Sequence, residues 1–498
     1  MGARRTVVLF VVGFLGLAFV GVGCGLIKFF HDMIHKQVAE NIPLKKGGES
    51  YKNWKKTSTP IYFQIFVFDL QNPDEVLAGR KPVVVQKGPY TYRERREKKD
   101  IAFYDNGTVA YREDQFFVFD REMSAGPEED TFTNVNLPML TIMNLLRYEF
   151  LPLKVLVDTM FAVVNETLFL KLSVKDILWG YPDNVLKEAE KIARAFNLSL
   201  PVSDQFGLFY QKNGTDDGLY LVDSGIKGVD HFGQIYLWNG AGKLDYWNSG
   251  LANAINGSDG TLYPPWTDTS QTKYLFSSDL CRSLGMEYRH SVTVKGIPLD
   301  QFVAPDMTFG NVSTNPYNAG FCTPPGHCLP AGLLNVSSCR TGAPVVMSMP
   351  HFLGCDPDIQ NYIKGIHPIR EDHESHLDVE PITGLVMRAA KRLQINTYLD
   401  KIHGFNSTEH LDSFYMPVLW LNESAEIGSN DAHTFKTKVL DLLKIADAVK
   451  YGLIALGGFL VLCVAGIVIM ARLRGKKSET FLVNAEDDEP LLIPNGRS

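Results

Sequence analysis

Two long uncharged runs near the ends of the chain constrain its fold more than any other feature. Residues 6–26 and 451–470 contain no charged side chain and are almost entirely apolar residues and glycine. A helix needs about 20 such residues to cross the hydrocarbon core of a bilayer. The apolar part of a cleaved signal peptide is shorter, about 7–15 residues. We therefore predict that both runs are transmembrane helices of the mature protein.

Basic residues predict the orientation of these two spans. Arg4 and Arg5 precede the first run, and four Lys and Arg residues follow the second within residues 472–477. Lys and Arg beside a span stay on the cytosolic side. Both chain ends are therefore expected in the cytosol. The predicted organisation is a cytosolic N-tail (1–5), a lumenal domain (27–450) between the spans, and a cytosolic C-tail (471–498).

Glycosylation signals agree with this topology. All the N-x-S/T acceptor sequences lie between the two spans, where a lumenal domain would meet the glycosylation machinery. The expected acceptor asparagines are Asn106, Asn165, Asn197, Asn213, Asn256, Asn311, Asn335, Asn406 and Asn422.

The cysteines indicate disulfides in an oxidising compartment. Two of the seven, Cys24 and Cys463, lie in the spans, and the other five fall within residues 281–355. Such clustering in a lumenal domain is typical of a local disulfide framework. Five is an odd number, so at least one thiol is free or pairs between chains. A zinc site is disfavoured because the sequence has no C-x-x-C pair.

The composition and motifs speak against catalysis and nucleic-acid binding. The formal net charge is −7, which does not suit a polyanionic partner. No nucleophile elbow, zinc-protease or phosphate-loop motif is present. We therefore expect a non-enzyme with no catalytic residue, no metal ligand and no cofactor. The best chemical cluster is His367, His373, Glu374 and His376, which we interpret as a polar surface loop whose histidines could sense acid pH.

Strand patterns dominate the region between the spans. Residues 61–70 are apolar on both faces and predict a buried strand. Residues 80–95 predict two short strands interrupted at Gly88-Pro89. Residues 392–399 alternate as a half-buried strand should.

Helical patterns are fewer. Residues 183–196 place their apolar side chains on one face of a helix. Residues 137–164 are apolar nearly all round, with Pro138 and Pro152 interrupting them. Such a segment is either core or a surface for lipid or a partner, and the sequence favours neither reading.

The C-terminal tail carries a candidate sorting signal. An acidic cluster spans residues 486–489, and Asp487 stands four residues before a pair of leucines. An acidic segment can meet a basic adaptor surface while two leucines fill an apolar pocket. We predict that Asp487, Leu491 and Leu492 form a dileucine signal read by clathrin-adaptor complexes.

Several longer motifs together resemble one family along essentially the whole chain. They are GPYTYRE (88–94), WGY (179–181), FGLFYQKNGTDDG (206–218), INGSDG (255–260), DLCRS (279–283), NAGFC (318–322), GAPVVMSMPHFL (342–353), KRLQIN (391–396) and LWLNES (419–424). In this order, and between two terminal spans, they resemble the class B scavenger receptor family. Within that family the acidic dileucine tail is most similar to that of the lysosomal member.

The resemblance implies an α+β fold. The expected lumenal domain is a large antiparallel β-barrel with an apical helical bundle, an internal hydrophobic tunnel for lipid, and a transmembrane helix on either side. The apical helices would match residues of about 137–171 and 182–197. The implied disulfides are Cys281–Cys339 and Cys322–Cys328, which leaves Cys355 free.

The resemblance also implies partners and a location. The lysosomal member carries β-glucocerebrosidase on its apical helices, and the corresponding contact residues here are Leu146, Glu149, Leu153 and Val157. The lysosomal member's pH-sensing histidine corresponds to Glu149, a departure that speaks against pH-controlled release. Expected lipids are cholesterol and phospholipid, and the expected location is the lysosomal and late endosomal membrane, with some protein at the plasma membrane. The alternative is a plasma-membrane scavenger receptor for lipoproteins or fatty acids. The sequence leaves open whether the protein forms a homodimer.

Overall fold

The computed structural model describes residues 3–195, 204–340 and 342–486. The chain divides into two compact units. Unit 1 comprises Met1–Gln37 and His433–Ser498, and unit 2 comprises Val38–Ala432.

Unit 1 is built on two long helices, α1 (Ala3–Asn41) and α11 (Asp441–Glu486). Both are long and apolar enough to cross a membrane, and they contain the predicted spans. Glycines allow the two helices to approach closely. A Cβ atom placed on Gly16 would lie 2.9 Å from the carbonyl oxygen of Gly457. Small residues at such crossings are typical of helix packing inside membranes.

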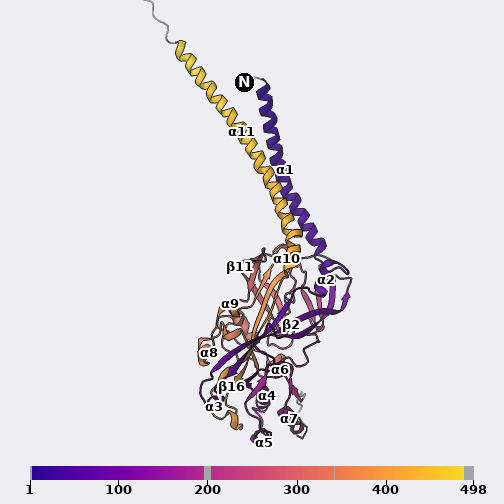
Figure 1. Ribbon diagram of the computed structural model, residues 1–498, viewed down its shortest axis with the longest axis vertical. Coiled ribbons are helices and arrows are strands. Elements are labelled where there is room, and N and C mark those ends of the chain that lie inside the picture. The colour runs from indigo at the N-terminus through magenta and orange to yellow at the C-terminus, as the bar shows by residue number, and fades with distance from the viewer. Residues whose placement is uncertain (1–2, 196–203, 341, 487–498) are drawn as a thin grey trace, which may run out of the picture. The chain divides into compact units, whose positions relative to one another are not determined.

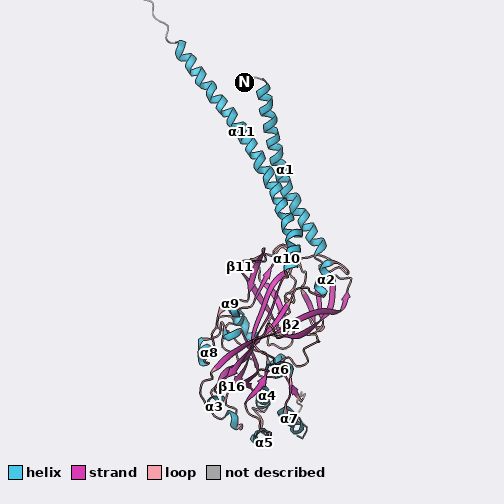
Figure 2. Cartoon of the chain, in the orientation of Figure 1, coloured by secondary structure: helices cyan, strands magenta, loops and turns pink. Residues whose placement is uncertain are grey.

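Unit 2 is organised around one antiparallel sheet of 13 strands (Figure 2). Its main path runs β10-β11-β12-β15-β16-β17-β1-β2-β3-β8-β9, and β14 joins it through β16. The strands of this sheet are β1 (Ile61–Leu70), β2 (Val84–Phe103), β3 (Thr108–Asp120), β8 (Tyr220–Asp223), β9 (Ile235–Trp238), β10 (Lys273–Ser277), β11 (Arg282–Val294), β12 (Ile297–Val303), β13 (Leu334–Asn335), β14 (Val345–Ser348), β15 (His376–Val379), β16 (Val386–Leu399) and β17 (Phe414–Glu426).

Two small two-stranded sheets and short helices complete unit 2. The sheets pair β4 (Thr131–Val135) with β5 (Phe169–Ser173) and β6 (Tyr181–Pro182) with β7 (Gln205–Phe206). The helices are α2 (Glu49–Lys55), α3 (Pro73–Leu77), α4 (Leu137–Leu145), α5 (Leu151–Val163), α6 (Val174–Trp179), α7 (Asn184–Ala195), α8 (Pro357–Tyr362) and α9 (Arg370–His373), and α10 (Ser429–Phe435) crosses the boundary between the units.

The core follows from the apolar strands at the centre of the sheet. β1 lies between β2 and β17, so both of its edges are paired, and Ile65, Val67 and Phe68 have no exposed surface. Strands that are covered on both faces read as continuous apolar runs. The predicted strand at 61–70 is therefore confirmed as β1.

A short loop segment nearly closes the sheet into a barrel. β9 and β10 are the two ends of the main strand path. Ile235 N on β9 donates to the carbonyl of Gly257 at 2.8 Å, and Phe276 N on β10 donates to the carbonyl of Ser258, also at 2.8 Å. The segment 257–258 therefore bridges the two end strands and satisfies backbone groups that a free sheet edge would leave unpaired. The α+β fold with an antiparallel barrel is confirmed.

One strand prediction is wrong. The region around Gly88-Pro89 is not a break between two strands, because β2 is continuous from Val84 to Phe103. The peptide bond before Pro89 is cis, and the register with β1 shifts between Ile65 and Val67. A bulge of this kind lets a strand continue past a proline that cannot donate to the ladder.

Candidate functional site

Three helices gather at one end of unit 2. Helices α4, α5 and α7 lie at the end away from α2 (Figure 1), and α7 contacts both α4 and α5. We call these three the apical helices. Helices α4 and α5 lie within residues 137–171 and α7 lies within residues 182–197, where apical helices were expected. Residues 169–171 belong to strand β5, and residues 196–197 lie outside the described residues.

Local sequence explains where α4 and α5 begin. The side chain of Asn136 accepts a hydrogen bond from Met139 N and so caps α4. Its amide nitrogen donates to Glu166 and to the carbonyl of Thr167, which ties the cap to the segment after α5. Pro152 lies in the first turn of α5, where its missing N–H is not needed. The proline therefore starts a new helix instead of interrupting one.

Polar contacts hold the turn between α4 and α5 against the loop that follows β16. Arg147 donates two hydrogen bonds to Asp400, at 2.8 Å and 2.7 Å. Farther along α5, Asp158 accepts from both the backbone and the side chain of Asn406. A bidentate arginine–carboxylate pair fixes orientation as well as distance. These contacts therefore fix the position of the turn relative to the loop after β16.

The outer side of these helices is apolar and exposed. Tyr148 keeps 94% of its surface exposed and Val163 keeps 79%, which is unusual for side chains of this size in a folded domain. We call this set the apical patch; its members are Leu145, Tyr148, Phe150, Leu151, Val155, Leu156 and Val163. Leu151 and Val155 are one helical turn apart, so the outward face of α5 repeats with the helical period.

The predicted cargo residues lie mostly on the opposite face. Leu146, Leu153 and Val157 are buried, with 2% exposure at Leu153, so they pack against the interior and offer no contact surface. Glu149 is exposed in the turn between α4 and α5. The prediction assigned these three buried residues to the wrong side of the helices, because a segment that is apolar all round does not reveal which face points inward. The sequence did offer one signal for the exposed residues, because Tyr148 and Phe150 lie just before Pro152, in the turn between the two helices.

The histidine cluster is not a surface loop. His373 and Glu374 are buried, and the His373 ring stacks on His351 with ring centroids 4.5 Å apart. His351 in turn contacts Gln86 Oε1 at 2.6 Å. Burial lowers the pKa of His351 to about 3, with a further contribution from His373, and burial lowers the pKa of His373 to about 4. Both rings therefore remain neutral at pH 5, and this pair does not act as an acid sensor.

The rest of that cluster also lacks the geometry of a metal site. Burial lowers the pKa of His376, and Glu374 is held by Arg289 and Arg370, which use its carboxylate oxygens. His367 is exposed. Across residues 3–195, 204–340 and 342–486, no group of three His, Cys, Asp or Glu side chains could hold a metal ion.

Comparison with known proteins assigns the family. Residues 11–469 match the model of the CD36 family. The chain belongs to the CD36 family. It is 37% identical to Lysosome membrane protein 2 of Mus musculus over 434 residues, which cover 87% of this chain and 88% of that protein. Lysosome membrane protein 2 of Homo sapiens gives the same identity and coverage.

A second group of relatives is nearly as similar. Scavenger receptor class B member 1 of Sus scrofa is 33% identical over 446 residues, which cover 90% of this chain and 86% of that protein. The expected class B scavenger receptor resemblance is therefore confirmed. These relatives are named as membrane proteins and receptors, which supports the role of a membrane scavenger receptor for this CD36-family chain.

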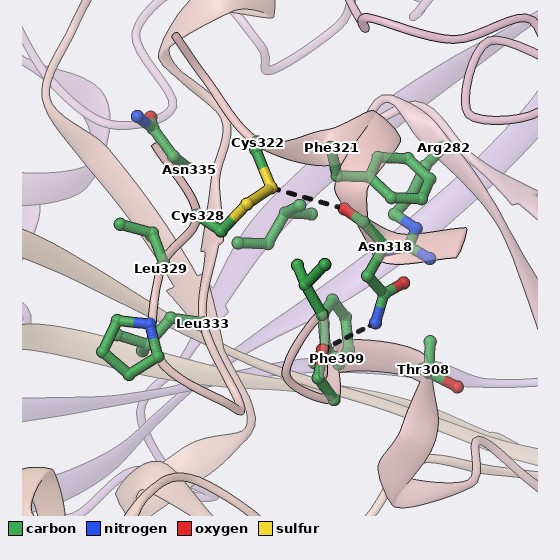
Figure 3. A pocket seen from close by; sticks show the side chains of 14 residues that line it. Arg282, Thr308, Phe309, Asn318, Phe321, Cys322, Cys328, Leu329, Leu333 and Asn335 are labelled. Atoms are coloured by element: carbon green, nitrogen blue, oxygen red, sulfur yellow. Dashed lines mark hydrogen bonds between the residues drawn. A yellow bond between two sulfur atoms is a disulfide. The ribbon is translucent and has the colours of Figure 1, made fainter. Parts of the chain in front are cut away.

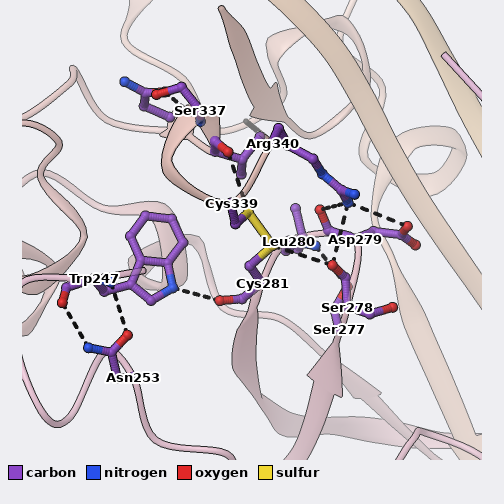
Figure 4. Close-up of a disulfide and its surroundings, with 12 residues drawn as sticks. Trp247, Asn253, Ser277, Ser278, Asp279, Leu280, Cys281, Ser337, Cys339 and Arg340 are labelled. Carbon is purple, nitrogen blue, oxygen red and sulfur yellow. Dashed lines mark hydrogen bonds and ion pairs between the residues drawn. A yellow bond between two sulfur atoms is a disulfide. The ribbon is translucent and has the colours of Figure 1, made fainter. Parts of the chain in front are cut away.

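The cysteines of this CD36-family chain form the two disulfides that the resemblance implied. Cys281 is bonded to Cys339 (Figure 4), and Cys322 to Cys328. Beside the first bridge, Trp247 Nε1 donates to the carbonyl of Cys281 at 2.6 Å. Cys355 is free and buried, and burial raises the pKa of its thiol, which keeps it in the unreactive neutral form.

The structure describes most of the predicted glycosylation sites but none of the predicted sorting signal. None of the acceptor asparagines in the described part of the chain is buried; Asn335 and Asn422 are half-buried and the others are exposed. Asn197 lies outside the described residues, as do Asp487, Leu491 and Leu492 of the predicted sorting signal.

Proposed function

We propose that this protein is a lysosomal membrane receptor that binds cargo through the apical patch and passes lipid through its barrel. The observation that carries the proposal is the apical patch itself, a set of large apolar side chains exposed on one group of helices. Exposed apolar clusters of this kind mark binding surfaces in soluble domains. Similarity to Lysosome membrane protein 2 supports the lysosomal location, and the two long apolar helices support membrane anchoring.

Two classes of cargo suit the patch. One is a lysosomal enzyme such as β-glucocerebrosidase, and the other is a lipid such as cholesterol or phospholipid. Tyr148 and Phe150 are the residue types that contribute most at interfaces, because a rigid ring buries much area at small entropic cost. Glu149 stands between them in place of the lysosomal member's histidine, so we expect enzyme binding without histidine-triggered release.

The double substitution Tyr148→Ser/Phe150→Ser tests the apical patch. Removing two aromatic anchors should weaken cargo binding by about 30-fold or more, the equivalent of about 2 kcal/mol. Both side chains are exposed, so stability should change by no more than about 0.5 kcal/mol. Binding is measured by co-precipitation of β-glucocerebrosidase with the full-length protein at pH 7 and pH 5, and by transfer of a fluorescent cholesterol analogue in cells.

The control variant removes two large exposed apolar side chains elsewhere on the domain. Tyr317 and Ile369 are also exposed but lie outside the apical helices, so Tyr317→Ser/Ile369→Ser should bind cargo as the wild type does. Loss of enzyme binding with lipid transfer intact would assign the patch to protein cargo, and the reverse would assign it to lipid. Unchanged binding of both cargoes in the Tyr148/Phe150 variant would refute the proposed role of the patch.

The tail substitution Leu491→Ala/Leu492→Ala tests the lysosomal destination. Loss of both leucines empties the apolar pocket of the adaptor, so most of the protein should move from lysosomes to the cell surface. Surface biotinylation and co-localisation with a lysosomal marker measure the shift. Ile493→Ala, the next residue along, is the control and should leave the distribution unchanged. Wild-type protein that already resides at the plasma membrane would contradict the proposed destination.

A plasma-membrane scavenger receptor is the second candidate function. It is favoured by the 33% identity to Scavenger receptor class B member 1, which spans 90% of this chain. Under this alternative the apical patch would contact lipoprotein particles or fatty acids. Lipoprotein uptake by cells that display the wild-type protein at their surface would support it.

A further inference from the structure

A small pocket lies beside the Cys322–Cys328 disulfide (Figure 3). Its cavity volume is about 30 Å³, enough for a water molecule or a small ion, and the pocket is partly open to solvent. The walls are mostly apolar, with Phe309, Phe321 and Leu333 among the lining residues, and the side chain of Arg282 also reaches it.

Arg282 is buried without a counter-charge. The residue is only 6% exposed, and its Nε is fully buried with no hydrogen-bond partner. The guanidinium packs on aromatic rings, 3.7 Å from the centroid of Phe321 and 5.3 Å from that of Phe309. Among the described residues, no carboxylate forms an ion pair with it. By contrast, the buried Lys98 is paired with Glu113.

This arrangement leaves a positive charge only partly compensated. An isolated buried cation is costly, and a stacked aromatic ring offsets only part of that cost. Burial lowers the pKa of Arg282 to about 9, with no neighbouring charge contributing, so the group stays charged at neutral and acidic pH. A buried charge of this kind is normally paired or bound to an ion.

We propose that the Arg282 pocket is a binding site for a small inorganic anion of the size of chloride. The pocket has room for a small ion, and the larger part of its lining surface is apolar. Thr308, whose hydroxyl is a neutral hydrogen-bond donor, is also among the lining residues. The anion completes the pairing of Arg282 and stabilises the packing around the Cys322–Cys328 loop.

Thermal unfolding of the purified full-length protein tests this site. Chloride replaces gluconate at constant ionic strength, so that general screening does not change. A chloride concentration 100 times the dissociation constant should raise the wild-type Tm by about 3 °C, given the size of the domain. Sodium hexanoate forms a parallel series, because a lipid carboxylate could present the same negative charge.

Two variants separate the site from general effects. Arg282→Met removes the charge and keeps an apolar stem, so its Tm should not respond to chloride and should equal or exceed the wild-type Tm in gluconate. Arg93→Met, which removes an exposed arginine paired with Asp120, should keep the full chloride response.

Diffraction provides a measurement that does not depend on any variant. Crystals of the wild-type protein grown in bromide should show an anomalous peak in contact with the Arg282 guanidinium, and excess chloride should displace it. The proposal is overturned if the wild type shows no chloride-specific rise in Tm, or if Arg282→Met shows the same rise. Stabilisation by hexanoate but not by chloride would also overturn it, since the ligand would then be a lipid carboxylate.

Discussion

Replacing Glu113 with alanine should lower the free energy of unfolding by about 3–5 kcal/mol, because the change leaves a buried ammonium without its partner. Glu113 lies on β3 directly opposite Lys98 of β2, and the two form an ion pair. The side chain of Lys98 is only 6% exposed and that of Glu113 only 10%. The Lys98 ammonium also lies over Trp54 and Tyr111, so it cannot turn to solvent without disturbing the aromatic packing.

A surface pair supplies the control for this prediction. Glu426 pairs with Lys295 at 3.2 Å, but their side chains are 45% and 34% exposed. Glu426→Ala should therefore cost no more than about 1 kcal/mol. Denaturant unfolding of the purified full-length protein, followed by tryptophan fluorescence, compares the two variants. Equal losses of unfolding free energy in the two variants would show that burial of the Lys98–Glu113 pair does not increase the cost of removing the carboxylate.

A double substitution separates the buried charge from the cavity that alanine leaves. Lys98→Met/Glu113→Leu replaces both charges with apolar groups of similar size, and such replacements of buried ion pairs are often neutral or stabilising. The double variant should therefore be more stable than Glu113→Ala alone. A double variant as unstable as the single one would mean that lost packing, and not the unpaired ammonium, causes the loss.

Strand β2, which carries Lys98, shows how far the sequence could predict the fold. Strand β1 was predictable because its residues form a continuous apolar run, and helix α7 because its apolar residues repeat with the helical period. In β2, alternation distinguishes two faces, and Arg93 and Arg95 are exposed while Glu94 and Lys98 are buried. The residue types on both faces are charged, so no local pattern indicates which face is inside. The partner that makes burial of Lys98 tolerable is on another strand.

The sequence predicted which segments form the candidate site, but not which face of each helix is exposed. The family resemblance placed apical helices in the apolar stretch at 137–164, where α4 and α5 lie, yet of the four predicted contact residues only Glu149 is exposed. Helical phase depends on what the helix packs against, here the loop containing Asp400 and Asn406, which is far away in sequence. The prediction of a surface loop at the histidine cluster was wrong for the same reason, because burial of His373 depends on its contact with His351, which lies elsewhere in the sequence.

Barrel closure is the feature that local pattern could least reveal, and Gly257→Ala should disrupt it. Gly257 has φ of +80°, and a Cβ atom there would lie 1.9 Å from the carbonyl oxygen of Tyr274 on β10. That oxygen belongs to the backbone of a sheet strand, so relief requires the strand itself to move. Strain from positive φ adds about 1–2 kcal/mol and overpacking about 1–3 kcal/mol, which gives an expected loss of about 3 kcal/mol.

Substitution of Gly260, in the same loop, separates the strain of positive φ from the steric overlap of the added Cβ atom. Its φ is +86°, but a Cβ atom there would meet no atom within 4 Å, so Gly260→Ala carries only the conformational cost of about 1 kcal/mol. Hydrogen exchange gives the decisive comparison. The amides of Ile235 and Phe276, which bond to the 257–258 segment, should exchange faster in Gly257→Ala and at the wild-type rate in Gly260→Ala. Equal exchange in both variants would mean that the segment 257–258 does not hold β9 and β10 together, and that the sheet is closed by its remaining contacts.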